Sequence, residues 1–458
     1  MNPVLQSEIN NLIQNSDYET LDHFCRESIP MVVAESLSVF PPEEILKVIP
    51  RQEPALMARI FCDLPVDVQL NVAGKMDNSA LVLLVTWMDP DDRVDFLKDL
   101  PGDRVGPIMR SLAKAEREDI RLLSSYEEGT AGSVMTSDYV ALKASLTVKE
   151  ATSRIRLEAP DKESIYYSYI IDDNRTLLGF ISLKNIIMAN PKDLLSQVMH
   201  DNIVSVGVNE DKHEAARIIS RYDLIAVPVV DEENRIVGII THDDAVDIIE
   251  EEHSDDLDMI AGLTNIDDDT SYLKTSVWSN YRSRVIWLAL MVFMGLISGA
   301  VIQKFSDALS RMMILTVYIP MLGGTGGNSG SQASAVVIRA LGTGSITIKN
   351  FFAVIWKEFR VSLLLAVTLG ILTFVRVYFF SGSQIFPPGI NIVTVSVTIG
   401  LALAIQVITA TILGGILPMI ASVFKIDPAV VASPALSSIV DITGLLIYFN
   451  LARLILGI

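Results

Sequence analysis

Asp441 is the residue whose surroundings most strongly indicate chemistry. It stands in the middle of an apolar segment, and the nearest preceding acidic residue is Asp427. A carboxylate at the centre of a bilayer costs at least ~2.5–3.5 kcal/mol, and such residues usually line a path for ions or protons. Asp441 is therefore either part of a cation pathway or a structural carboxylate that pairs with Arg376 or with neighbouring hydrogen-bond donors.

A second unusual feature is a run of small residues inside another apolar segment, from Gly323 to Gln332, which reads Gly-Gly-Thr-Gly-Gly-Asn-Ser-Gly-Ser-Gln. Glycine lets two membrane helices approach closely. It also lets a helix unwind, so that its carbonyl groups face a water-filled cavity. The spacing alone leaves both interpretations open.

Carboxylates also crowd between residues 243 and 269. A solvated, charged linker is the ordinary interpretation of such a run. A dozen carboxylates in this stretch would nevertheless repel one another unless cations bridged them, and clusters with only oxygen ligands favour hard ions such as Mg2+ and Ca2+ over Zn2+. The acidic residues are Asp243, Asp244, Asp247, Glu250, Glu251, Glu252, Asp255, Asp256, Asp258, Asp267, Asp268 and Asp269.

Two very different halves of the chain must position these side chains. Residues 1–283 hold 26 basic and 51 acidic residues, a formal charge of −25, whereas residues 284–458 hold ten basic and four acidic residues. The acidic half would repel nucleic acid, but it can collect cations. Cys25 and Cys62 are too few for a disulfide framework and lack the spacing of metal ligands, so we interpret them as inert thiols.

Five apolar runs in the second half are each long enough to predict a transmembrane helix, at residues 285–302, 312–338, 361–380, about 392–423 and 428–456. The loop between the second and third runs is the most basic, which predicts that it and the N-terminal half lie in the cytosol. The N-terminus lacks the features of a signal peptide, and this leads to the same orientation.

Residues 133–251 contain an internal duplication. Val134-Met135 and Val198-Met199 open the two copies, and Gly179–Ser182 matches Gly238–Thr241. The first copy has about five extra residues near 157–164. Each copy predicts a strand, an amphipathic helix, an apolar strand, a turn, a strand and a helix. This order resembles a tandem pair of CBS domains, which sense adenosine ligands and metals.

Residues 1–130 predict a small superhelix of short helices. Prolines stand where helices should begin, at Pro42, Pro65, Pro90 and Pro101, since the first turn of a helix does not need the missing N–H. The acidic residues beside Pro90 are most simply charges that the helix dipole stabilises.

The order of a helical domain, a CBS pair, an acidic linker and five membrane helices resembles the MgtE family of magnesium channels and transporters, over nearly the whole chain. The specific motifs are Thr130-Ala131-Gly132, Val134-Met135-Thr136, Tyr318-Ile319-Pro320, Gly323 to Asn328, Asp427-Pro428-Ala429 and Asp441 to Tyr448. The predicted fold is thus multidomain: an N-terminal all-α superhelix (1–131), α/β CBS domains (132–196 and 197–253), an acidic linker helix (254–283) and a five-helix transmembrane domain (284–458).

The resemblance implies a homodimer in a bacterial inner membrane that imports Mg2+ through one pore formed by the two membrane halves. It implies that Asp441 faces the permeating ion, with Gly327, Asn328, Ser331 and Ser433 nearby. It also implies that cytosolic Mg2+ bridges the helical and CBS domains and closes the pore. The regulatory set is Asp91, Asp211, Asp223, Asp244, Asp247, Glu252, Asp255, Asp256 and Asp427.

The sequence departs from the family pattern at several positions. Ser331 and Ser433 stand where the pattern has Asn, which leaves the selectivity among Mg2+, Co2+, Mn2+ and Ni2+ open. Asn185 replaces an Asp in the first CBS copy, which weakens the case for the ATP binding of some relatives. Tyr167, Lys184 and Asn185 remain as candidate nucleotide contacts.

Three other functions are alternatives. A membrane metalloprotease needs zinc-binding histidines in the membrane, yet all five histidines precede residue 284, so we do not expect an enzyme. A sensor of Mg2+ or nucleotide that does not transport would need neither the glycine run nor Asp441. A transporter mainly for another divalent metal, such as Co2+ or Mn2+, is the closer alternative.

Overall fold

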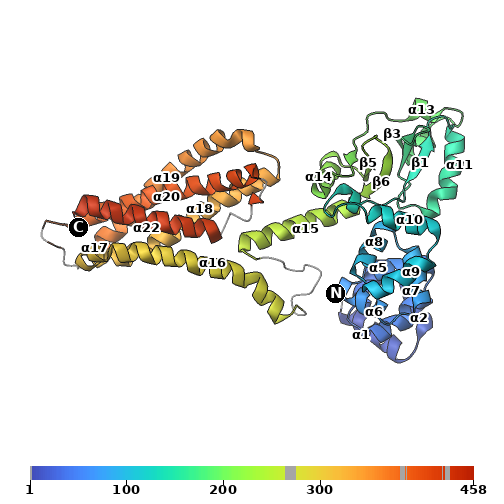
Figure 1. Ribbon diagram of the computed structural model, residues 1–458, viewed down its shortest axis with the longest axis horizontal. Helices are drawn as coiled ribbons and strands as arrows, with labels where there is room; N and C mark the ends of the chain where they lie inside the picture. Colours follow the sequence, from blue (N-terminus) through green and yellow to red (C-terminus); the bar gives the residue numbers. More distant parts are fainter. Residues whose placement is uncertain are drawn as a thin grey trace. The chain divides into compact units, whose positions relative to one another are not determined.

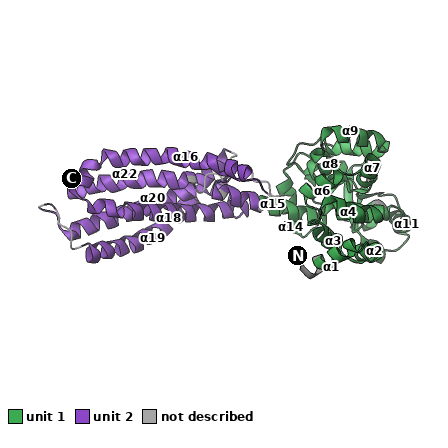
Figure 2. Cartoon of the chain, turned by 90° about the horizontal axis from the view of Figure 1, so that it is seen from below, with its two compact units in different colours: residues 1–252, 268–272 green, residues 253–267, 273–458 purple. Residues whose placement is uncertain are grey.

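The computed structural model describes residues 3–263, 275–381, 387, 389–424, 427–428 and 434–457 (Figure 1). Two compact units are present (Figure 2): among the described residues, the first ends at Glu252 and the second begins at His253. The domain order predicted from the sequence is confirmed, with helices first, a repeated α/β part next and long apolar helices last.

The first unit begins with ten short helices. Pro42 and Pro90 occupy the first position of their helices, and Pro65 and Pro101 directly precede theirs, as predicted. The helices are α1 (Pro3–Gln14), α2 (Tyr18–Glu27), α3 (Pro30–Leu37), α4 (Pro42–Val48), α5 (Pro54–Cys62), α6 (Val66–Ala73), α7 (Asn78–Trp87), α8 (Pro90–Asp99), α9 (Gly102–Ser111) and α10 (Lys114–Leu123).

Arg93 attaches α8 to the end of α7. Its side chain is only 6% exposed, and its guanidinium donates hydrogen bonds to the carbonyl oxygens of Val85 (2.8 Å) and Met88 (2.7 Å). These carbonyls lie at the end of a helix, where the helix itself supplies no donors. On the same helix Phe96 packs edge to face against Phe61 of α5, with ring centroids 5.3 Å apart. The first turn of α8 is thereby held in place.

The two α/β repeats have the same order and topology. In the first, β1 (Val140–Lys143) runs parallel to β2 (Tyr167–Ile171), which pairs antiparallel with β3 (Leu177–Ser182). In the second, β4 (Val206–Gly207), β5 (Ala226–Val230) and β6 (Ile236–Thr241) repeat this pattern. The helices are α11 (Val148–Glu158), α12 (Leu183–Met188) and α13 (Leu195–Val198) in the first repeat, and α14 (Lys212–Tyr222) and α15 (His242–Ala261) in the second.

The extra residues of the first repeat lie where the sequence places them. Eight residues separate α11 from β2, but only three separate α14 from β5, so the difference of five is confirmed. The repeats also contact each other: Thr136 pairs with Ile239 in an isolated bridge, and Phe180 pairs with His200. One buried apolar cluster continues from the ten helices into the second repeat, which makes the helices and the repeats one unit.

The second unit is a bundle of long helices, shown side by side in Figure 1. Within the described residues, four of them are long and apolar enough to cross a membrane: α16 (Val277–Lys304), α19 (Phe351–Phe380), α20 (Ile392–Val423) and α22 (Pro434–Leu456). The fifth, α18 (Ile314–Gly342), has 29 residues, but its glycines and polar side chains lower its hydropathy. That α18 also spans the membrane stays a prediction. A short α17 (Ser306–Arg311) precedes it.

Two of these helices begin earlier than the apolar runs of the sequence. Helix α16 starts at Val277 and α19 at Phe351, because both continue past charged residues that interrupt the apolar composition but not the helix. Helix α15 starts in the first unit and continues to Ala261, so the beginning of the predicted acidic linker belongs to the last helix of the second repeat.

The glycine run does not unwind. Helix α18 is continuous through Gly323–Gln332, and the run is where α18 meets α20. A Cβ atom on Gly414 would lie 2.1 Å from the carbonyl oxygen of Gly330, closer than atoms can approach. The hydroxyl groups of Ser329 and Thr411 share a hydrogen bond of 2.8 Å beside this contact. Of the two interpretations of the glycine run, close helix packing is therefore the one that the structure shows.

Candidate functional site

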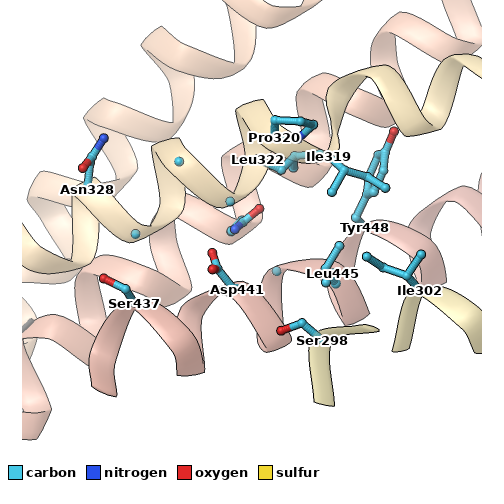
Figure 3. A pocket seen from close by; sticks show the side chains of 15 residues that line it. Ser298, Ile302, Ile319, Pro320, Leu322, Asn328, Ser437, Asp441, Leu445 and Tyr448 are labelled. Carbon is cyan, nitrogen blue, oxygen red and sulfur yellow. The ribbon is translucent and has the colours of Figure 1, made fainter. Parts of the chain in front are cut away.

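A cavity of about 460 Å³ lies between four helices of the second unit (Figure 3). Its walls combine apolar side chains with a few polar groups, as is usual for a ligand site. The lining residues are Ser298 and Ile302 from α16, Ile319, Pro320, Leu322, Gly323, Gly324, Gly327 and Asn328 from α18, Gln406 from α20, and Ser437, Asp441, Gly444, Leu445 and Tyr448 from α22.

Asp441 extends from α22 toward α18 (Figure 3). A Cβ atom on Gly323 would lie 3.1 Å from the Oδ1 atom of Asp441, so the absence of a side chain at Gly323 leaves room for the carboxylate. The guanidinium of Arg376 lies over the ring of Phe380 instead, 4.7 Å from its centroid. In the part of the chain that the structure describes, no cation forms an ion pair with Asp441.

Only some of the other predicted pore residues line this cavity. Gly327 and Asn328 line the cavity together with Asp441. Ser331 does not line it, because it lies about one helical turn further along α18. Ser433 lies outside the described residues. The cavity adds Ser437, which stands one turn before Asp441 on α22 and which the sequence analysis did not single out.

Gln406 is the other lining residue that the sequence analysis missed. A signal was present, since Gln406 is the only residue with a side-chain amide between Ile392 and Val423. Polar residues inside membrane segments are usually functional, but a neutral amide is less conspicuous in an apolar segment than a charge.

Contacts at the far end of α22 set its register against α18. The hydroxyl of the buried Tyr448 donates a hydrogen bond of 2.9 Å to the carbonyl oxygen of Leu315. The next residue, Phe449, stacks on Phe305 with ring centroids 4.9 Å apart. These contacts fix the height of α22, and Asp441 consequently lies opposite the glycines of α18.

A second cavity, of about 730 Å³, lies within the first unit, and carboxylates are the most numerous polar side chains in its lining. Nine acidic side chains face it, against three basic ones, Arg59, Arg93 and Lys162. The acids come from the end of α5, the start of α8, the first repeat and the first turns of α15. They are Asp63, Asp89, Asp91, Asp92, Asp138, Glu163, Asp243, Asp244 and Asp247.

Several carboxylates of this acidic cavity are hard to ionise. Burial, and after it the negative charge of Asp244, raises the pKa of Asp91 well above its ordinary value. Burial is also the main reason why the pKa of Asp92 rises to about 6 and that of Glu163 to about 7. The Oδ1 atom of Asp91 is buried without a hydrogen-bond partner among the described residues. With nine acids against three basic side chains, the cavity has too little counter-charge for all its acids to ionise.

Hydrated Mg2+ would supply that counter-charge. The donor set consists of oxygen atoms, which Mg2+ prefers, and Mg2+ usually keeps several of its water ligands. Among the residues that the structure describes, no three His, Cys, Asp or Glu side chains gather closely enough to hold a metal ion directly. The cavity therefore suits an ion that reaches the carboxylates through its water shell.

The remaining predicted regulatory residues do not join the acidic cavity. Asp211 caps α14 and accepts a hydrogen bond of 2.8 Å from the backbone N–H of His213. Asp223 ends the same helix in a left-handed conformation, with φ of 52°. Glu252 pairs with Arg217 at 3.1 Å. The other three belong to the second unit: Asp255 and Asp256 on α15, and Asp427 before α22.

The three candidate nucleotide contacts lie together at one corner of the first repeat. Tyr167 pairs with Ser182 across β2 and β3, and Lys184 and Asn185 follow in the first turn of α12. The side-chain amide of Asn185 is 2.7 Å from the Nε2 atom of His200. That corner is thus built by both repeats.

Comparisons with known proteins agree with this architecture. The profile of the MgtE intracellular N domain matches residues 30–129, and the CBS domain profile matches residues 131–192 and 195–251. The MgtE profile, which describes a divalent cation transporter, matches residues 319–451.

Two curated relatives match most of the chain. The magnesium transporter MgtE of Thermus thermophilus is 36% identical over 340 residues, which cover 74% of this chain and 73% of the relative. The magnesium transporter MgtE of Bacillus subtilis is 32% identical over 384 residues, 84% of this chain and 82% of the relative. Among solved structures, the soluble part of a magnesium transporter matches with a TM-score of 0.52 and 26% identity, over 54% of this chain and 98% of that one.

Proposed function

Because the chain belongs to the MgtE family of divalent cation transporters, we propose that it carries Mg2+ across a membrane through the cavity around Asp441. The observation that carries this proposal is the carboxylate of Asp441, which faces a cavity of about 460 Å³ without a cationic partner among the described residues. An anion kept in the membrane without a counter-ion is suited to attract a cation. The family is one of transporters, in agreement with the prediction that the chain is not an enzyme.

The lining suits an ion that keeps its water shell. Mg2+ loses water reluctantly, and a conducting site must hold its ion weakly enough to release it. Asp441 contributes one negative charge, while Asn328 and Ser437 offer neutral oxygen atoms to the bound water. One charge with several neutral contacts attracts the ion without trapping it.

The acidic cavity of the first unit is the proposed regulatory site. At high Mg2+ concentration, hydrated ions between Asp91 on α8 and Asp244 and Asp247 on α15 neutralise the carboxylates and hold these segments together. At low Mg2+ concentration the carboxylates repel one another and the assembly loosens. The fit rests on the buried, unpartnered Oδ1 atom of Asp91 and on the all-oxygen donor set. That the pore closes when Mg2+ holds these segments together is inferred from the resemblance to the family.

Several finer features belong to the same proposal. The chain forms a homodimer in the lipid of a bacterial inner membrane, with the first unit in the cytosol, as for a transporter with bacterial relatives. The domain boundaries at residues 131, 196, 253 and 283 also stay predictions, as do the roles of Asp211, Asp223, Glu252, Asp255, Asp256 and Asp427, and the binding of ATP beside Tyr167.

Uptake into proteoliposomes tests the function. The full-length protein is reconstituted in vesicles that contain a Mg2+ dye, and Co2+, Mn2+ and Ca2+ are added as competitors. We expect Mg2+ uptake that disappears in Asp441→Asn. If the vesicles took up mainly Co2+ or Mn2+, that metal would be the substrate in place of Mg2+. If the folded protein moved no cation, the result would favour a sensor that does not transport.

A further inference from the structure

Gln406 is a deeply buried polar residue of the membrane half, and among the described residues neither end of its side-chain amide has a hydrogen-bond partner. It lies near the middle of α20 and is 1% exposed. Neither its Oε1 nor its Nε2 atom makes a hydrogen bond to any residue that the structure describes. A buried amide without partners destabilises a protein, because it has lost its hydrogen bonds to water and gained none in return.

The neighbouring helices make space for this amide. A Cβ atom on Gly326 of α18 would lie 2.4 Å from the Nε2 atom of Gln406, and a Cβ atom on Gly444 of α22 would lie 2.1 Å from the same atom. Both distances are far below the closest approach of real atoms. The carboxamide can occupy this slot only because each of the two helices has a glycine beside it.

Nearby polar groups that hold the bundle together differ from Gln406 in one respect. Tyr448 donates to Leu315, and Ser329 shares a hydrogen bond with Thr411, so each of these has a protein partner. Gln406 has a slot and no partner within the described residues. A methionine or leucine would fill a similar volume without the cost of an unpaired amide. Packing therefore does not account for Gln406.

The slot opens into the cavity of Asp441. Gln406 lines this cavity from α20, and both Asp441 and Gly444 line it from α22, one helical turn apart. The cavity thus brings together the carboxylate of Asp441 and the unpartnered carboxamide of Gln406. A hydrated cation presents water molecules that can donate to the oxygen atoms of both groups.

We propose that Gln406 determines the specificity of this pathway by hydrogen bonding to the water shell of the cation that Asp441 attracts. The inference rests on the proposed transport function and deepens it. An amide adds a hydrogen bond without adding charge, so it can favour an ion of one hydrated size while still allowing the ion to leave. Its position between Gly326 and Gly444 fixes how far it reaches into the cavity.

Gln406→Met tests the proposal in full-length protein. This variant removes both polar atoms and keeps a side chain of similar length. Thr398→Val is the matched control, since Thr398 is fully buried on the same helix, bonds the carbonyl oxygen of Thr394 and does not line the cavity. Three quantities are measured: Mg2+ uptake into proteoliposomes, the ratio of Mg2+ uptake to Ca2+ and Mn2+ uptake, and the thermal unfolding temperature in detergent.

We expect Gln406→Met to unfold at the wild-type temperature or above, because an unpaired amide has been removed. Its Mg2+ uptake or its preference for Mg2+ over Ca2+ should fall by roughly tenfold or more, the effect of losing about one good hydrogen bond to the ion's shell. Thr398→Val should stay within about twofold of the wild type, since its hydroxyl lies outside the cavity.

Gly326→Ala provides a second test, because its methyl group would displace the amide of Gln406 although Gly326 does not line the cavity. Alone, Gly326→Ala should reduce the preference for Mg2+. Added to Gln406→Ala, it should have little further effect, because its effect would act through the side chain of Gln406.

Wild-type uptake and selectivity in Gln406→Met would overturn the inference while leaving the proposed function intact. A loss of uptake that only followed a loss of thermal stability would also overturn it, since Gln406 would then be structural. Wild-type protein that carried no cation, or normal uptake in Asp441→Asn, would instead contradict the proposed function, and with it this inference.

Discussion

Asp91, in the first turn of α8, and Asp244, in the first turn of α15, face the same cavity although more than 150 residues separate them in the chain. After burial, the charge of Asp244 is the largest cause that raises the pKa of Asp91. A favourable helix dipole explains why an acid stands at the start of α8. The helix dipole does not explain why Asp91 is buried opposite other acids. A cation bound between these acids would explain the arrangement, because it would stabilise their charges.

Stability of the first unit should therefore fall as the pH rises in the absence of divalent cations. The pKa of Asp92 rises from 3.8 to about 6 and that of Glu163 from 4.5 to about 7, so the folded state binds more protons than the unfolded state between these values. The contribution of these two groups to the free energy of unfolding is fully present below about pH 4. It is lost as the pH rises through about 6 to 7. Thermal unfolding of the Mg2+-free protein between pH 4 and 8 measures the change.

Mg2+ should reverse this loss at pH 8 and have little effect near pH 4, because protonated carboxylates do not bind the ion. The acids whose pKa is lowered, such as Asp77 and Asp173, ionise below this window and do not mask the trend. An unfolding temperature that rose between pH 4 and 7 without Mg2+ would contradict the assignment of a strained acidic cavity.

Neutralising the acidic cavity should separate conduction from its regulation. We expect the triple variant Asp91→Asn, Asp244→Asn and Asp247→Asn to conduct at Mg2+ concentrations that close the wild type, since it lacks the three carboxylates through which the ion is proposed to hold α8 and α15 together. Without Mg2+ it should unfold at a higher temperature, by roughly 2–4 °C for each kcal/mol of repulsion removed.

Patch recordings over a range of cytosolic Mg2+ concentrations measure the first effect. Asp173→Asn is the control, because Asp173 is an exposed acid that pairs with Lys143 outside the cavity. Inhibition by Mg2+ that was the same in the triple variant and the wild type would remove these three residues from the sensor.

Asp441→Asn should abolish transport and leave the fold unchanged. The amide keeps the shape of the carboxylate but loses its charge, and the attraction of a nearby unit charge for a divalent ion is large enough to change uptake roughly 100-fold. Asp307→Asn, at an exposed acid on α17, should transport normally. Proteoliposome uptake of both variants, with gel filtration to compare their assembly, measures the difference.

Gly414→Ala should destabilise the membrane half, because its methyl group would meet the carbonyl oxygen of Gly330 at 2.1 Å. Forcing extra volume into a packed contact typically costs about 1–3 kcal/mol. Gly342→Ala, at the end of α18 with no atom within 4 Å of the added methyl group, should be neutral or slightly stabilising. Thermal unfolding in detergent compares them, and equal stability of the two variants would show that α18 and α20 are not in close contact.

Much of the architecture could be predicted from the sequence because it depends on local patterns. Pro42 and Pro90 mark helix starts through a restriction on one backbone angle, which no distant residue alters. The matching strings of the two repeats revealed both the shared topology and the five extra residues before β2. Asp441 could be recognised because a charge in an apolar segment is conspicuous whatever surrounds it.

What the sequence could not determine was which residues meet. Whether Asn328 or Ser331 reaches the cavity depends on where α18 and α22 cross, and the contacts of Tyr448 and Phe449 set that height. The sequence also could not show that Asp211 and Asp223, two residues of the predicted regulatory set, cap the two ends of α14 and do not line the acidic cavity.

The sequence by itself thus determined the elements, their order and the one conspicuous charge, because composition and periodicity act within a segment. Only the tertiary structure decided that Asp91 lies opposite Asp244 and that the amide of Gln406 fits between Gly326 and Gly444. Both depend on how helices from distant parts of the chain are rotated and spaced, which follows from the packing of all their side chains at once.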